Sequence, residues 1–79
     1  MTTTAAETTA KRILYILVTE QGLRAGDGMS LADLLEDLVR HQIGEPEQQA
    51  ALEYAHQRGW LQTGPYGEVQ LTETGFAVD

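Results

Sequence analysis

The clearest hydrophobic pattern in the chain follows Ser30. Apolar residues recur there with the spacing i, i+3, i+4, i+7 and i+8, at Leu31, Leu34, Leu35, Leu38 and Val39. This spacing is typical of a helix with one buried face. Ser30 is a good N-cap, and Asp33 sits three residues later, as in an approximate capping box. We therefore predict an amphipathic helix that ends before Gly44 and turns the acidic residues Asp33, Glu36 and Asp37 to solvent.

A second helix is predicted upstream, from about Thr9 to Gln21. Its inner face has helical spacing and consists of Ala10, Ile13, Leu14, Leu17 and Gln21. Tyr15 and Ile16 lie off that face, so the helix is apolar most of the way round. Two interpretations stay open: a central helix buried on several sides, or a helix whose Tyr15 and Ile16 form a dimer seam.

A third helix is predicted to begin at Glu45-Pro46, because proline is pre-set for the first helical turn. Gly59 is its stop signal. Its inner face is expected to hold Ala51, Leu52 and Ala55, and its outer face Gln49, Ala50, Glu53 and Gln57.

Two short strands should follow, at about 60–63 and 68–72, joined by the four-residue loop 64–67. Val69 and Leu71 alternate with polar residues, which indicates one buried and one wet face. A very short extra strand is expected near Met29–Leu31. The Thr-Glu-Thr-Gly stretch at 72–75 is predicted to end the second strand. Phe76 and Val78 are then expected to close one end of the core.

The pattern as a whole predicts an α+β fold, in which a three-helix bundle is followed by a two-stranded β-hairpin. Seventy-nine residues suffice for one domain. We expect residues 1–8 to be a disordered N-terminal tail and residues 9–79 to form the domain. Thr8 or Thr9 would cap the first helix.

Charge is the strongest constraint that composition places on function. Five lysines and arginines stand against twelve acidic residues, for a net charge of -7. Such a charge repels nucleic acid and anionic membranes at long range. The N-terminus lacks the pattern of a signal peptide, no apolar run is long enough for a membrane span, and cysteine is absent. A cytoplasmic location without membrane contact is therefore expected.

Two segments resemble those of a known superfamily. Residues 52–61, LEYAHQRGWL, resemble the end of the third helix of a winged helix–turn–helix domain and its entry into the wing. Residues 67–75, GEVQLTETG, resemble the returning wing strand. The resemblance extends from about Thr9 to Gly75 and identifies no closer family.

The winged-helix resemblance implies DNA binding through the third helix and the wing. The residues that would then contact DNA are Gln49, Gln57, Arg58, Thr63 and Tyr66. The charges depart from this pattern, because acids stand where DNA would lie, at Glu45, Glu47, Glu53 and Glu68. Arg58 is expected to pack its stem beside the core.

No motif points to catalysis, to a cofactor or to a metal. His41 and His56 lack a partner at a metal-binding spacing, and Ser30 is better explained as a cap than as a nucleophile. We expect a non-enzymatic module that binds another protein or itself through an acidic and apolar surface. The expected surface residues are Tyr15, Ile16, Asp33, Glu36, Asp37, Glu53 and Tyr66. The alternative is a DNA-binding transcriptional regulator.

Overall fold

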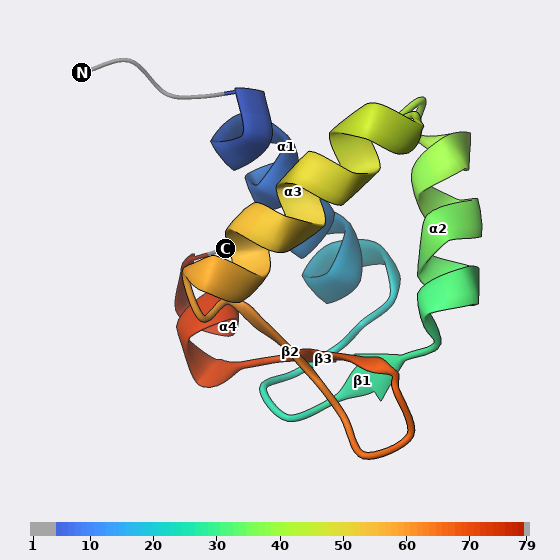
Figure 1. The fold of residues 1–79 in the computed structure, drawn as a ribbon. Helices are drawn as coiled ribbons and strands as arrows, with labels where there is room; N and C mark the ends of the chain where they lie inside the picture. The colour runs from blue at the N-terminus through green and yellow to red at the C-terminus, as the bar shows by residue number, and fades with distance from the viewer. Residues whose placement is uncertain (1–4, 79) are drawn as a thin grey trace.

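Four α-helices and a three-stranded antiparallel sheet make up residues 5–78, the part of the chain that the computed structural model describes (Figure 1). The strand order is β1-β3-β2. The predicted α+β class is confirmed. In chain order the elements are α1 (Ala5–Tyr15), the π-helical turn η1 (Ile16–Glu20), β1 (Gly28–Met29), α2 (Leu31–Arg40), α3 (Glu45–Gln57), β2 (Leu61–Thr63), β3 (Val69–Leu71) and α4 (Glu73–Val78).

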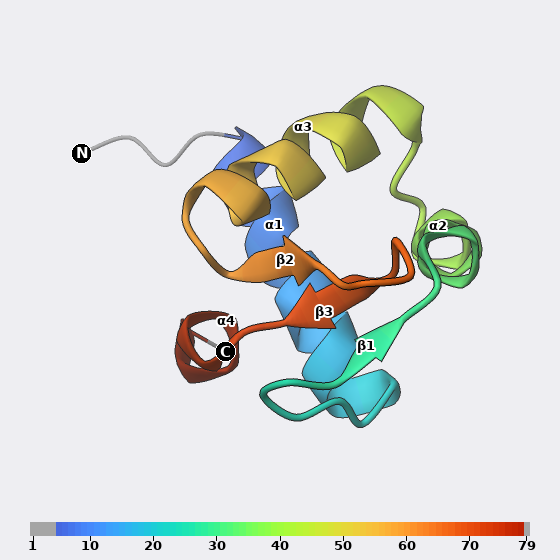
Figure 2. The same cartoon turned by 60° about the horizontal axis from the view of Figure 1, so that its bottom comes forward.

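In the turned view of Figure 2, α1 runs behind the sheet, and α3 crosses the N-terminal part of α1. The predicted apolar inner residues of α1, from Ala10 to Leu17, are fully buried. The helix begins at Ala5, four residues before the predicted start, so residues 5–8 are helical and do not belong to a tail. Thr8 and Thr9 accordingly lie inside the helix and do not cap it. Residues 1–4 of the expected tail lie outside the described part of the chain.

The last turn of this helix widens into η1. The Gln21 amide donates to the Ile16 carbonyl over 3.0 Å, a bond that spans five residues. Two consecutive side chains of this turn, Ile16 and Leu17, are buried in the core, and Ile16 is only 3% exposed. The burial of Ile16 agrees with the interpretation of a central helix buried on several sides, whereas Tyr15 is 56% exposed. Gly22, with a φ of 70°, ends the turn in the left-handed region.

Helix α2 has the predicted cap, because the Asp33 amide donates to Ser30 Oγ over 3.2 Å. Its buried stripe is narrower than predicted. Leu34 and Leu38 are fully buried, but Val39 is 62% exposed. Asp37, predicted to face solvent, is only 7% exposed. Its carboxylate accepts a hydrogen bond of 3.1 Å from Gln21 Nε2 and lies 3.8 Å from the guanidinium of Arg40.

Helix α3 packs against α1 through small residues. Ala51 and Ala55 are fully buried, so the two backbones can approach closely. The helix stops at Gly59, whose φ is 76°, as predicted. Trp60 then folds back against the ring of Tyr54, with 5.5 Å between the ring centroids.

The hairpin pairs Leu61 with Leu71 and Thr63 with Val69. Its loop spans residues 64–68, one residue more than predicted, and contains a turn closed by the bond from the Gly67 amide to the Gly64 carbonyl. The expected extra strand exists one residue earlier than predicted, as β1, and Met29 pairs with Val69. Each strand is shorter than predicted by one or two residues.

The structure departs most from prediction after β3, where the expected stop is the short helix α4. Thr72 Oγ1 accepts from the Gly75 amide over 3.0 Å. Its single proton faces two carbonyl oxygens, that of Gly59 at 2.5 Å and that of Trp60 at 3.0 Å. The Thr72 backbone amide also donates to the Trp60 carbonyl over 3.1 Å. A Cβ on Gly75 would lie 2.2 Å from that carbonyl oxygen, so only glycine allows this approach. Phe76 packs against the core as expected, whereas Val78 is 39% exposed and is not part of the core cluster.

Candidate functional site

An apolar groove runs between α2, α3 and the hairpin. It consists of two adjoining hollows of about 420 and 300 Å³, which share Leu31, Gln49 and Leu52. Leu35, Pro46 and Val69 complete the apolar lining. We call it the α2–α3 groove. It arises because α2 buries only a narrow stripe and leaves Leu31 partly exposed beside Leu52 of the neighbouring helix.

The rim of the α2–α3 groove is acidic. Glu45 and Glu53 of α3 line it, and no lysine or arginine is among its described lining residues. Glu47 is exposed on the same helix. A ligand in this groove would therefore meet apolar side chains below and carboxylates beside it.

The hairpin loop adds a fixed negative charge near one end of this groove. Glu68 Oε1 accepts from the Tyr66 amide over 2.9 Å. Hydrogen bonds from the Glu68 and Tyr66 backbone amides lower the pKa of the Glu68 carboxyl from its usual value. Glu68 and Tyr66 line a further hollow of about 460 Å³ that shares Leu31 with the groove. Tyr66 is 92% exposed at the tip of the loop.

The residues expected to contact DNA are only partly brought together. Gln49 and Thr63 both line the α2–α3 groove, and Tyr66 lies on the adjacent loop. Gln57 is exposed but does not line the groove. The guanidinium of Arg58 lies 5.6 Å from the ring centroid of Tyr54 and 6.0 Å from that of Trp60, beside the core as expected.

The residues expected to form one partner surface fall on separate parts of the molecule. Glu53 lines the α2–α3 groove, while Tyr66 occupies the hairpin tip. Asp33 and Glu36 are exposed on α2 but do not line the groove, and Asp37 is buried. Tyr15 and Ile16 line a different hollow. Sequence periodicity assigned Leu31, Leu35 and Leu52 to the core, and so it missed their part in the groove.

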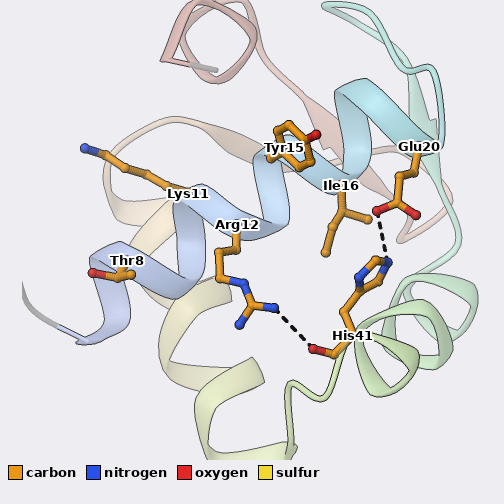
Figure 3. Close-up of a pocket in the computed structure, with 7 residues that line it drawn as sticks. All are labelled: Thr8, Lys11, Arg12, Tyr15, Ile16, Glu20 and His41. Atoms are coloured by element: carbon orange, nitrogen blue, oxygen red, sulfur yellow. Dashed lines mark hydrogen bonds and ion pairs between the residues drawn. The ribbon is translucent and has the colours of Figure 1, made fainter.

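A separate hollow, which we call the α1 hollow, lies along the outer side of α1 and has a volume of about 480 Å³ (Figure 3). Arg12 Nη2 donates to the His41 carbonyl over 3.2 Å, and His41 Nε2 lies 3.1 Å from Glu20 Oε2. These contacts tie the end of α2 to α1 and form one wall. The residues that line the hollow are Thr8, Lys11, Arg12, Tyr15, Ile16, Glu20 and His41.

Within residues 5–78, no group of three or more histidine, aspartate or glutamate side chains is arranged to hold a metal ion. Over the same range, no helix combines the length and the apolar character that crossing a membrane requires. Comparisons with protein-family models, with curated proteins and with solved structures found no match.

Proposed function

We propose that this protein is a small non-enzymatic interaction module with a winged-helix arrangement, and that it binds a basic, amphipathic protein segment in the α2–α3 groove. The element order supports the winged-helix assignment, since three helices precede the β2–β3 hairpin and β1 pairs with the returning strand. In that assignment α3 is the helix that would read DNA, and the hairpin is the wing.

One observation carries the proposal: the groove beside the would-be reading helix has an apolar floor and an acidic rim. A helix that reads DNA needs cations to neutralise phosphates and polar side chains to reach base edges. Here Glu45 and Glu53 line the groove instead. An amphipathic helix lays its apolar face into such a groove, and its flanking lysines or arginines would pair with the glutamates.

The alternative function, DNA binding by a transcriptional regulator, has one feature in its favour. Gln49 and Thr63 are exposed and line the same groove, where an amide and a hydroxyl could meet base edges. Glu45 and Glu53, which line the groove beside Gln49, would repel the phosphates of DNA. The charge of -7 also makes long-range attraction to phosphates unfavourable.

An NMR titration tests the two functions side by side. The ligands are a designed helical peptide with a leucine face and a lysine face, the same peptide with glutamates in place of lysines, and a mixed-sequence DNA duplex at about 50 mM salt. We expect the basic peptide alone to shift the amide signals of Leu31, Gln49 and Leu52. Glu53→Lys should weaken its binding roughly 3- to 10-fold, a typical effect for a rim charge.

Glu36→Lys is the matched control, because Glu36 is an exposed glutamate that does not line the groove. It makes the same change in net charge and should leave the affinity for the basic peptide nearly unchanged. Equal weakening by both variants would reduce the effect to net charge and contradict a specific groove. Amide shifts in α3 and the hairpin with DNA, and none with the peptide, would favour the regulator.

A further inference from the structure

The α2–α3 groove is divided along α3 into its two hollows. The residues of α3 that line the first hollow fall within positions 45–52, and those that line the second fall within positions 49–56. The second hollow is therefore displaced by four residues, or about 6 Å along the helix axis at a rise of roughly 1.5 Å per residue. The shared residues Leu31, Gln49 and Leu52 lie where the two hollows meet.

The first hollow is mainly aliphatic. Leu35 and Pro46 line this hollow and not the second, and the shared Leu31 and Leu52 continue its wall. Leu31 is 42% exposed and the other two leucines are half-buried, so their apolar surface is open to a ligand. An aliphatic side chain placed against this wall removes apolar surface of both molecules from water, which is favourable.

The second hollow has a polar outer side. Glu53 and His56 of α3 and Thr63 of β2 line this hollow and not the first, and all three are exposed. Glu53 and His56 are three residues apart, so their side chains are neighbours on the helix surface. None of the ion pairs among residues 5–78 involves Glu53. A ligand here meets the shared leucines on one side and a carboxylate beside an imidazole ring on the other.

We propose that the partner is a helix that places an aliphatic side chain in the first hollow and, four residues away, an arginine in the second. This ligand presupposes the function proposed for the α2–α3 groove. The spacing follows from the displacement of the hollows, because residues i and i+4 of a helix share a face and are about 6 Å apart along its axis.

Arginine matches both sides of the second hollow. Its aliphatic stem can pack on Leu31 and Leu52, while its planar guanidinium bonds to the Glu53 carboxylate through two N–H groups and stacks on the His56 ring. Lysine offers a point charge without the planar group, so it should bind less well at this position.

NMR titration with designed peptides tests the spacing. Each peptide is an alanine-rich helix with one leucine and one arginine. Because the ligand can run either way along α3, the arginine stands four residues before the leucine in one peptide and four residues after it in another, and the tighter binder is the reference. Moving the arginine to a distance of seven residues keeps the composition and should weaken binding about 10-fold, since the side chain then misses the second hollow. Equal affinities would overturn the spacing.

A double-mutant cycle tests the arginine contact. Replacing the peptide arginine by citrulline, its uncharged analogue, should weaken binding to the unaltered protein about 3- to 10-fold but should have little effect on binding to Glu53→Gln. Glu45→Gln is the matched control, because Glu45 lines only the first hollow and should show no coupling to the arginine. Circular dichroism establishes that both variants are folded. Equal coupling to both glutamates, or none to Glu53, would overturn the placement of the arginine.

Failure of the ligand assignment is distinguishable from failure of the groove function. If neither the reference peptide nor the peptide with a leucine face and a lysine face shifts the amide signals of Leu31, Gln49 and Leu52, the groove function fails and the ligand assignment fails with it. If the lysine-faced peptide binds while spacing and arginine have no effect, the groove function stands and only the assignment of the two side chains fails.

Discussion

The Tyr54 hydroxyl on α3 donates a hydrogen bond of 2.6 Å to the Glu7 carboxylate on α1. This bond lowers the pKa of Glu7 below its usual 4.5 and raises the pKa of Tyr54 above its usual 10.0. It joins residues 47 positions apart. It also explains why α1 begins earlier than its hydrophobic pattern indicates, since Glu7 belongs to the added turn.

Tyr54→Phe should lower the stability of the protein at neutral pH, and the loss should depend on pH. The lowered pKa of Glu7 makes its contribution complete above about pH 4.5 and removes it as the pH falls through the folded-state pKa. The raised pKa of Tyr54 makes its contribution complete below about pH 10.0 and removes it as the pH rises through the folded-state pKa. Urea unfolding from acid to alkaline pH measures the difference.

The control for this experiment is Tyr66→Phe, which removes the hydroxyl of a tyrosine at the exposed hairpin tip. It should unfold like the unaltered protein near neutral pH. A Tyr54→Phe difference that stays constant over the whole pH range would show that the ionised carboxylate contributes nothing.

Thr72→Val should destabilise the protein by about 1–2 kcal/mol. It removes the hydroxyl that accepts from the Gly75 amide and donates toward the Gly59 and Trp60 carbonyls, so α4 loses its N-cap and the side-chain part of its link to the hairpin. Thr74→Val makes the same chemical change at an exposed position of α4 and should cost much less. Denaturant unfolding compares the two, and equal losses would contradict the capping role.

Gly75→Ala should cost about 1–3 kcal/mol, because the added methyl group meets the Trp60 carbonyl and the backbone has to move. Gly44→Ala is the control, since nothing lies within 4 Å of a Cβ there and the φ of -84° is ordinary. That change should cost less than about 1 kcal/mol. Thermal unfolding reports both, and a tolerated alanine at 75 would count against the close approach.

Leu34→Ala and Val39→Ala separate the buried and exposed parts of the α2 pattern. Leu34 is fully buried, so its truncation should cost about 2–5 kcal/mol. Val39 is largely in water, and its truncation should change stability by less than about 0.5 kcal/mol. Urea unfolding of both variants measures the contrast. Comparable losses would mean that the apolar face is as wide as the periodicity predicts.

Short-range signals in the sequence were enough to predict where most of the helices and the hairpin turn begin and end. Ser30 caps α2 through a bond to an amide three residues away, and Gly59 ends α3 by its own backbone conformation. The 64–67 turn closes through a bond between Gly67 and Gly64. Each of these signals acts within a few residues, so it can be recognised before any tertiary contact is known.

Tertiary structure decided the features that depend on partners far along the chain. Asp37 is buried and bonded to Gln21, sixteen residues away, and α4 forms where Thr72 and Gly75 reach the Trp60 carbonyl. The groove exists because Leu31 and Leu52, from different helices, lie side by side and partly uncovered. Periodicity along one helix shows which side chains share a face. What covers that face is settled only when the helices pack.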